Sequence, residues 1–397
     1  MSQDSNDKNS ADQNLPSGGL LPAGLSDLMP AEAIGEAAVI NSLMSSLTAL
    51  GYARVKPPLV EFEETLLADG PGASLATNSF RVMDPQSSRM MAIRADMTAQ
   101  IARLAQTRMA HLPRPLRLAY FGDVLRIKPD PLNPERQLTQ VGAEMIGASD
   151  IVHDTELAVA ALTALQDAGV SQLTIDLGVP RLLAALMGDT EINTDLAAAV
   201  SSKDQALVRR HAGEDHAELI CALLDLPMAS FDHLEGQVTA LSARLPQAAA
   251  QMINDLMTMA SMIREALGDV MITIDPLESR GFDYHNGVAF SIFSPGIRGE
   301  LGRGGRYQTS ISQRGEVSTG VTLYLERVLR AVPKQDQLDI VYIPYEAGLS
   351  AWREARSQGR ICRLGAIGLS GQADQDADIA AMEATHIWDN GQIKPLK

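Results

Sequence analysis

Hydrophobic residues recur with a helical period near the start of the chain and with a strand period further along. Between about Pro30 and Gly51 they fall near one stripe of a helix, and Gly51 is well placed to end it. Leu116, Leu118 and Tyr120 recur instead at every second position, which is typical of a strand with one face toward a core. The first half of the chain therefore predicts both helices and strands.

A return strand is expected after a loop rich in proline. Three prolines, Pro129, Pro131 and Pro134, follow the first strand and cannot donate backbone hydrogen bonds to a sheet. The next polar positions, Gln140 and Glu144, are separated by an even number of residues, so they share one face of the predicted return strand.

The stretch ESRGFDYHNGVAFSIF, Glu278 to Phe293, predicts a β-hairpin. Its dipeptide Asn286-Gly287 is a strong turn signal, because both residues tolerate positive φ. On the expected return strand, alternate residues from Val288 onward would share one face. A purely structural hairpin needs none of the polar groups that precede this turn, so the stretch is also a candidate site.

The order of these patterns predicts an α+β protein with an antiparallel sheet. A helix-rich block interrupts the strand-rich pattern, which then resumes, so we expect an inserted helical subdomain. The expected divisions are a disordered tail (1–20), the two parts of the core (21–178 and 270–332), the helical insertion (179–269), a linker (333–338) and a short C-terminal α/β domain (339–397).

Composition narrows the class of protein. The chain of 397 residues carries a formal net charge of −16, which disfavours loose contact with polyanions. Its two cysteines, Cys221 and Cys362, indicate neither a disulfide framework nor a thiolate metal site, as in a cytosolic protein. No apolar run is long enough to span a membrane, and the spacing of the histidines disfavours a metal site.

Polar side chains on four predicted elements could form one pocket. The polar side chains on the paired strands, taken alone, would be consistent with the solvent-exposed face of a sheet that is buried on one side only. Similar sets on other elements weaken that interpretation, because an arginine, acids, hydroxyls and an amide together suit a free amino acid. The candidates are Asp96, Thr98, Arg126, Gln140, Glu144, Arg280, Tyr284 and His285, with Arg327 near a helix end.

Several motifs resemble those of the histidyl-tRNA synthetases, a class II aminoacyl-tRNA synthetase family. RGFDYHNGVAF is similar to the histidine-specific signature, and RADMTA to the family's Arg-Pro-Glu-Gly-Thr-Ala. The segment Arg126–Glu144 resembles the second class II signature, and GRGGRY with GVTLYLERV resembles the region of the third. The similarity runs from about Gly24 to Val332 and implies a class II synthetase-like antiparallel sheet flanked by helices.

The resemblance also implies roles for residues at matching positions. Asp96, Thr98 and Gln140 would hold the ammonium group of histidine, and Arg280 its carboxylate. Glu144 would face the imidazole. His285 stands where the family has a tyrosine with the same task.

Four departures from the family pattern fall on the ATP side of the site. Lys128 stands at a glutamate position, Leu138 at an aromatic position, Tyr324 at a glycine position and Pro134 at an arginine position. A lost base–aromatic stack alone costs about 1–3 kcal/mol. The amino-acid pocket is nearly intact, whereas the activation chemistry is expected to be lost.

This pattern resembles the synthetase paralogues that serve as regulatory subunits of ATP phosphoribosyltransferase. The resemblance implies no catalytic residue, cofactor or metal in this chain. It implies a short-form catalytic subunit as partner, dimers within a hetero-octamer, and free histidine as effector. The apolar runs and the net charge, for their part, predict no membrane partner and disfavour a nucleic-acid partner. The alternatives are an active histidyl-tRNA synthetase or another ATP-dependent amino-acid ligase, and a paralogue recruited as a nucleic-acid sensor.

Overall fold

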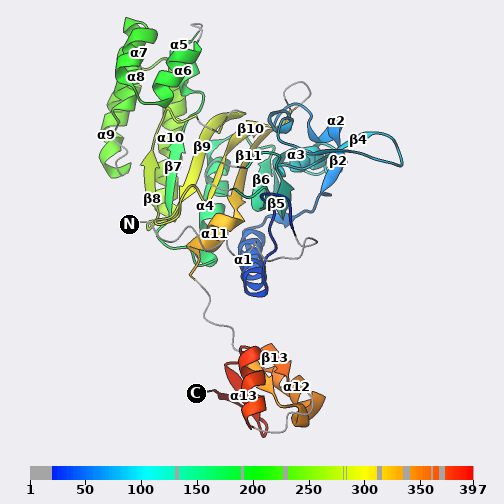
Figure 1. The fold of residues 1–397 in the computed structure, drawn as a ribbon. Helices are drawn as coiled ribbons and strands as arrows, with labels where there is room; N and C mark the ends of the chain where they lie inside the picture. Colours follow the sequence, from blue (N-terminus) through cyan, green and yellow to red (C-terminus); the bar gives the residue numbers. More distant parts are fainter. Residues whose placement is uncertain are drawn as a thin grey trace. The chain divides into compact units, whose positions relative to one another are not determined.

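The chain divides into two compact units, Met1–Pro333 and Lys334–Lys397. Figure 1 shows the fold in a computed structural model. The structure describes residues 20–129, 134–188, 192–226, 231–279, 281–282, 284–310, 315–333, 340–358, 361–365 and 372–396.

An eight-stranded sheet forms the centre of the first unit. Its inner pairs are antiparallel, whereas the pair at each edge is parallel. In spatial order the strands are β1 (Ala53–Arg54), β5 (Leu116–Leu125), β6 (Gln137–Ile146), β11 (Val317–Tyr324), β10 (Gly302–Gln308), β9 (His285–Phe293), β7 (Thr174–Gly178) and β8 (Met271–Ile274).

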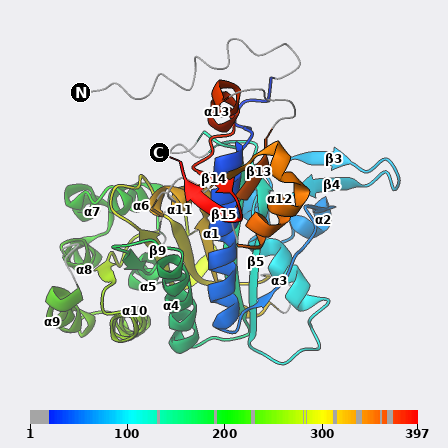
Figure 2. The same cartoon turned by 90° about the horizontal axis from the view of Figure 1, so that it is seen from below.

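Three helices pack on one face of this sheet: α1 (Pro30–Ala49), α4 (Ile151–Asp167) and α11 (Leu325–Ala331). Figure 2 shows α1 and α4 side by side, and the two helices pack against each other. The first matches the helix predicted from Pro30, and Gly51 follows its end with a φ of 93°. Val141, Ala143 and Met145 of β6 point into the core on this face.

The opposite face of the sheet carries α3 and a small second sheet. The helix α3 (Thr98–Gln106) packs over a buried cluster that includes Leu116, Leu118 and Tyr120, as their alternation predicts. The second sheet has the order β2 (Val60–Phe62), β4 (Met90–Ile93), β3 (Arg81–Met83) and is accompanied by α2 (Glu63–Leu66) and a short 3-10 turn (Ala73–Leu75).

The insertion between β7 and β8 is helical in its described part. Contacts join it to the stretch between the end of β8 and the start of β9: Arg181 donates to the carbonyl of His285 (3.3 Å), and Lys203 pairs with Asp275 (2.6 Å). Its helices are α5 (Leu182–Met187), α6 (Thr194–Ser201), α7 (Gln205–His211), α8 (Glu214–Leu224), α9 (Phe231–Ser242) and α10 (Gln247–Ala266).

The second unit is a small α/β domain with its own apolar core. Trp388 is buried in this core, and Trp352 packs against it while its indole N–H donates to the carbonyl of Cys362 (3.1 Å). Its sheet has the order β13 (Ile361–Leu364), β12 (Ile340–Ile343), β14 (His386–Asp389), β15 (Gln392–Pro395), and its helices are α12 (Gly348–Ser357), α13 (Gln372–Ala381) and a 3-10 turn (Tyr345–Ala347).

The hairpin predicted at Asn286-Gly287 is wrong. Both residues lie inside β9, which runs without a turn from His285 to Phe293, and the residues described just before it form no strand. The ladder between β9 and β10 shifts register here, because His285 faces Tyr307 whereas Ala289 faces Gly305. The Asn-Gly pair therefore lies where β9 bulges, although neither residue has a positive φ. A Cβ atom on Gly287 would lie 2.8 Å from the Cβ of Arg306, so a close approach requires the glycine.

Candidate functional site

Glycines line the sheet face on which the candidate residues meet. Because side chains alternate along a strand, the register puts Glu144 of β6 beside Gly320 of β11, and Gly320 in turn beside Gly305 of β10. A Cβ atom on Gly320 would lie 2.1 Å from a carboxylate oxygen of Glu144. The absence of a side chain at this position thus creates the space that Glu144 occupies.

Glu144 is fully buried and accepts hydrogen bonds from two tyrosines. Tyr307 donates to one carboxylate oxygen (2.9 Å) and Tyr120 to the other (3.2 Å). Burial raises the pKa of Glu144 to about 8, an effect that nearby Asp96 reinforces and the hydroxyl donors oppose. A carboxyl group poised in this way suits a ligand with a ring nitrogen that can donate or accept a proton.

A second group of predicted residues is joined by hydrogen bonds at the start of α3. The Gln140 amide donates to Asp96 (2.7 Å) and accepts from the backbone N–H of Met97 (3.1 Å). Asp96 also accepts from the backbone N–H of Thr98 (2.8 Å). These bonds fix the half-buried Asp96 carboxylate close to Glu144, so the site presents two acids.

Arg126 lies just beyond β5, at the edge of this group. Its guanidinium donates to the carbonyl of Ala95 (3.2 Å), next to Asp96, and its backbone pairs with Ser79. The side chain is half-buried. The structure therefore brings Asp96, Thr98, Arg126 and Glu144 to one region, from three separate stretches of sequence.

Tyr284 and His285 extend the site from the start of β9. Their rings stack at 4.4 Å, and Tyr284 meets Tyr307 edge-on at 5.7 Å. His285 is 4% exposed, and its Nδ1 has no partner among the described residues. Burial, with the nearby Arg303, lowers the pKa of His285 to about 3, so the ring is neutral. Arg280 and its neighbour Asp283 lie outside the described residues.

Tyr324 occupies the far side of the site, where the synthetase pattern has glycine. It pairs with Gln140 across the sheet, so its ring lies on the same face. The Arg327 guanidinium lies 5.2 Å from the centre of this ring, and Arg327 also donates to the carbonyl of Glu300 (3.0 Å). Burial raises the pKa of Tyr324 to about 12. The Tyr324 ring therefore fills space that a glycine would leave open, and Arg327 lies against it.

The other departures lie near the loop between β5 and β6. Leu138 is 6% exposed and belongs to the apolar cluster with Val124, so it offers no aromatic surface for stacking. Lys128 is exposed, and its backbone N–H donates to the Asn78 side chain (2.8 Å). Pro134 is described, but most of the loop just before it is not.

Three participants in the site were not identified from the sequence: Tyr120, Tyr307 and Gly320. Tyr120 belongs to the alternating apolar pattern of its strand, so the sequence indicates a core residue rather than a site residue. Tyr307 lies in the motif GRGGRY, whose glycines signal a close approach without saying to what. Gly320 is recognisable only through its register with Glu144.

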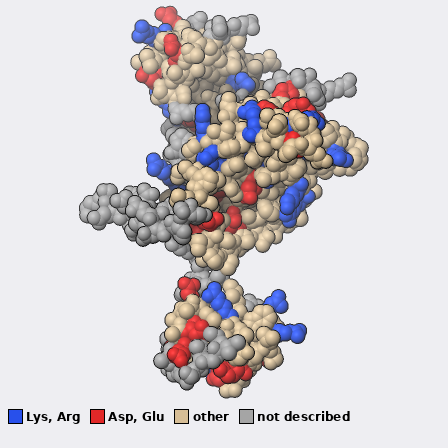
Figure 3. Space-filling model, turned by 45° about the vertical axis from the view of Figure 1, so that its right-hand side comes forward, with Lys and Arg blue, Asp and Glu red and all other residues tan. Residues whose placement is uncertain are grey.

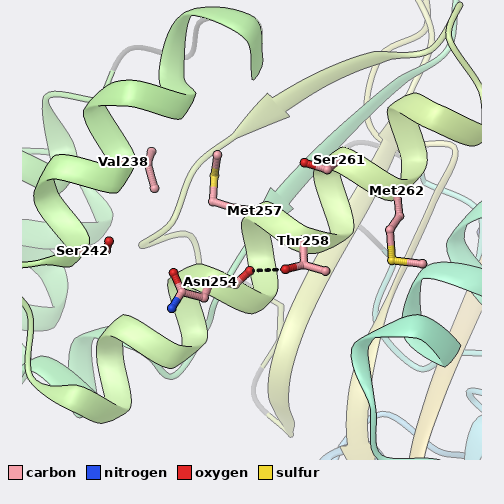
Figure 4. A pocket seen from close by; sticks show the side chains of 7 residues that line it. All are labelled: Val238, Ser242, Asn254, Met257, Thr258, Ser261 and Met262. Carbon is pink, nitrogen blue, oxygen red and sulfur yellow. Dashed lines mark hydrogen bonds between the residues drawn. The ribbon is translucent and has the colours of Figure 1, made fainter.

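Other parts of the described chain offer less chemistry. No group of three or more potential metal-ligating side chains occurs within it, and none of its helices is long and apolar enough to cross a bilayer. A groove of about 390 Å³ between α9 and α10 is lined by uncharged side chains (Figure 4). On the face drawn in Figure 3, acidic and basic side chains are interspersed.

Gly320→Ala is expected to lower the free energy of unfolding by about 1–3 kcal/mol, because the new methyl group would collide with the Glu144 carboxylate. Gly35→Ala is the matched control. Its Cβ would meet nothing within 4 Å in the interior of α1, so a gain of about 0.5–1 kcal/mol is expected. Urea unfolding of both variants measures the difference, and equal stability of Gly320→Ala and the parent chain would contradict the crowding argument.

Comparisons with known proteins agree with this fold. A family model described as histidyl-tRNA synthetase matches residues 24–328. A solved structure from Bacillus halodurans, described as an ATP phosphoribosyltransferase regulatory subunit/histidyl-tRNA synthetase, superposes with a TM-score of 0.75 at 22% identity, covering 92% of this chain and 97% of that one. The class is therefore a histidyl-tRNA synthetase-like protein with the class II synthetase fold.

Comparison with curated relatives shows which family within this class the chain belongs to. The ATP phosphoribosyltransferase regulatory subunit of Paramagnetospirillum magneticum is 44% identical over 346 residues, 86% of this chain and 89% of that protein. The protein of the same description from Rhodospirillum centenum is 41% identical over 387 residues, 96% of this chain and 97% of that one. The chain belongs to the family of ATP phosphoribosyltransferase regulatory subunits, and membership of a regulatory family supports a non-catalytic role.

Proposed function

We propose that this chain senses free histidine on behalf of a short-form ATP phosphoribosyltransferase catalytic subunit, in the first step of histidine biosynthesis. It activates that subunit and, on binding histidine, inhibits it. The observation that carries the proposal is the buried Glu144 carboxyl between Tyr120 and Tyr307, which suits an imidazole. A site without an imidazole ligand has little reason to bury an acid among aromatic hydroxyls.

The remaining groups suit the rest of the amino acid. Asp96, Thr98 and Gln140 would hold the ammonium group, which needs a fixed anion and acceptors. Arg280 would take the carboxylate, with Arg126 nearby. Tyr284 and His285 would close the pocket around the imidazole.

Regulation would follow from differential affinity. The chain would assemble as dimers within a hetero-octamer in the cytoplasm, and histidine would favour the inhibited arrangement. A coupling of about 1–3 kcal/mol between the histidine site and the catalytic subunit is typical of such systems. The contacts of Arg181 with His285 and of Lys203 with Asp275, which join the insertion to the stretch between β8 and β9, offer one route for this coupling.

Synthetase or ligase activity is the competing function, and the ATP side of the site argues against it. A nucleotide would have to displace the Tyr324 ring and free the Arg327 that lies against it. A nucleic-acid partner also fits poorly, because the formal net charge is −16 and the charges in Figure 3 form no broad basic surface among the described residues of that face.

The test is calorimetric titration of the chain with histidine and with ATP, followed by assay of the catalytic subunit with and without the chain. We expect histidine binding without ATP binding, activation by the chain, and inhibition by histidine. Arg280→Ala should weaken histidine binding about 10- to 100-fold, because a charged hydrogen-bonding partner is removed, and should leave activation intact.

Arg117→Ala is the control for this variant, since Arg117 forms a two-point pair with Glu156 away from the site. Full inhibition of Arg280→Ala by histidine would show that another pocket is the sensor. Tight ATP binding together with pyrophosphate exchange in the presence of histidine would favour the synthetase instead.

A further inference from the structure

A second arginine, Arg303, lies beside the loop that contributes the predicted carboxylate ligand. It stands on β10, paired with Ser291 of β9 and Thr322 of β11, so its side chain leaves the sheet on the same face as Glu144 and Tyr324. The side chain is 29% exposed and mostly enclosed. None of the roles given above uses it.

Glu300 holds the Arg303 guanidinium in one orientation. One Glu300 carboxylate oxygen accepts from Arg303 Nε (2.8 Å) and from a second guanidinium nitrogen, so the pair is joined at two points. The other oxygen accepts from the Ser291 hydroxyl (3.0 Å). The backbone carbonyl of Glu300 accepts from Arg327 (3.0 Å). Because Glu300 is itself held by Ser291 and Arg327, the Arg303 guanidinium that it binds has little freedom to rotate.

The remaining guanidinium nitrogen reaches across to the loop before β9. Arg303 Nη1 donates to the carbonyl of Gly281 (2.9 Å), and the guanidinium lies 5.3 Å from the centre of the Phe282 ring. Gly281 has a φ of 75°, and a Cβ there would lie 1.9 Å from Nη1. The loop thus needs glycine at this point both for its conformation and for the approach of Arg303.

Other bonds at the described residues of this loop lie within it or at its end. Among the described residues, Phe282 donates to the carbonyl of Ser279 (3.1 Å) and His285 to that of Phe282 (3.0 Å), both within the loop. Arg181 donates to the carbonyl of His285, at the end of the loop. The Arg303 contact therefore joins the sheet to the middle of the loop, between Ser279 and His285.

We propose that Arg303 is a positioning residue, which shapes the Gly281 loop so that Tyr284 and His285 face the ligand before it binds. The proposal rests on the proposed histidine-sensing function. Its physical content is preorganisation, since a loop that is already ordered loses less entropy when the ligand arrives. Loss of Arg303 should therefore weaken ligand binding although the arginine need not touch the ligand.

The test is titration of the full chain with histidine in Arg303→Ala, with and without guanidinium chloride at a non-denaturing concentration. We expect the dissociation constant to rise about tenfold or more, as for the loss of a charged hydrogen-bonding group. Added guanidinium should recover part of the affinity by occupying the vacated place. A merely stabilising ion pair would give no such recovery.

Arg117→Ala controls for the loss of a two-point arginine–carboxylate pair, because its side chain is 31% exposed, close to that of Arg303, but faces Glu156. It should bind histidine as the parent chain does. If Arg303→Ala does not fold, Arg303→Lys replaces it, since lysine cannot span both Glu300 and the Gly281 carbonyl. Unchanged histidine affinity in the variant, or a loss that guanidinium does not recover, would overturn the proposal. Failure of the parent chain to bind histidine would overturn the proposed function instead.

Discussion

Glu144→Gln is expected to weaken histidine binding about 100-fold. Glutamine has nearly the same shape, so Tyr120 and Tyr307 keep a carbonyl to bond with on one side only. The other side becomes an N–H group, which faces a tyrosine hydroxyl and can neither accept a hydrogen bond from the imidazole nor exchange a proton with it. Losing a hydrogen bond to an ionisable group and leaving its partners mispaired together costs about 1.5–3 kcal/mol, or roughly 10- to 100-fold, and full burial favours the upper end.

Calorimetric titration of histidine measures this loss directly. Glu156→Gln is the control, because Glu156 is also paired and partly buried but belongs to α4 on the other face of the sheet. Its histidine affinity should equal that of the parent chain. Equal affinities for Glu144→Gln and the parent chain would remove Glu144 from the pocket and with it the main support for an imidazole ligand.

The contribution of Glu144 to the stability of the parent chain is expected to fall by a few kcal/mol between about pH 4.5 and pH 8, because the unfolded chain releases the Glu144 proton in this range and the folded chain keeps it. Burial raises the pKa of this carboxyl to about 8 in the folded protein, from its ordinary value of 4.5. A raised pKa means that the folded state binds the proton more tightly. The stability that this proton contributes is fully present below the pKa of the carboxyl in the unfolded chain. It is lost as the pH rises through the pKa of the carboxyl in the folded protein. Each unit of difference between the folded and unfolded pKa of the carboxyl corresponds to about 1.4 kcal/mol in the free energy of unfolding.

Glu144→Gln lacks this titration, so the difference in unfolding free energy between the variant and the parent chain should grow with pH in favour of glutamine. Urea unfolding at several pH values in this window measures it. His285, whose pKa burial lowers to about 3, acts in the opposite direction at the acid end, and it does so equally in both proteins. A constant difference across the window would mean that Glu144 titrates normally.

Local pattern was sufficient for the elements that bear most of the site. The even spacing of Gln140 and Glu144 predicts that they share a face, and the structure puts Val141 and Ala143 in the opposite core. The helix from Pro30 follows from its apolar stripe in the same way. These features depend on periods of two and 3.6 residues, which a single segment carries by itself.

Contacts between distant segments were not predictable. The partners of Glu144 depend on the register of β11 against β6 and on the placement of β10, which no local period encodes. Asn286-Gly287 shows the same limit, since the dipeptide signals backbone freedom and tertiary pairing decided between a turn and a bulge. Arg303 lay within a recognised motif, yet its role depends on the Gly281 carbonyl, 22 residues away.

The tryptophans have a practical consequence. The chain contains two, and both Trp352 and Trp388 belong to the small C-terminal unit, whereas the phenols around Glu144 belong to the other unit. Selectively excited indole emission therefore originates only in the C-terminal unit. Near-ultraviolet dichroism of the buried tyrosines, by contrast, includes the surroundings of the pocket. One unlabelled sample thus carries an optical signal, the indole emission, that reports on the C-terminal unit alone during denaturation.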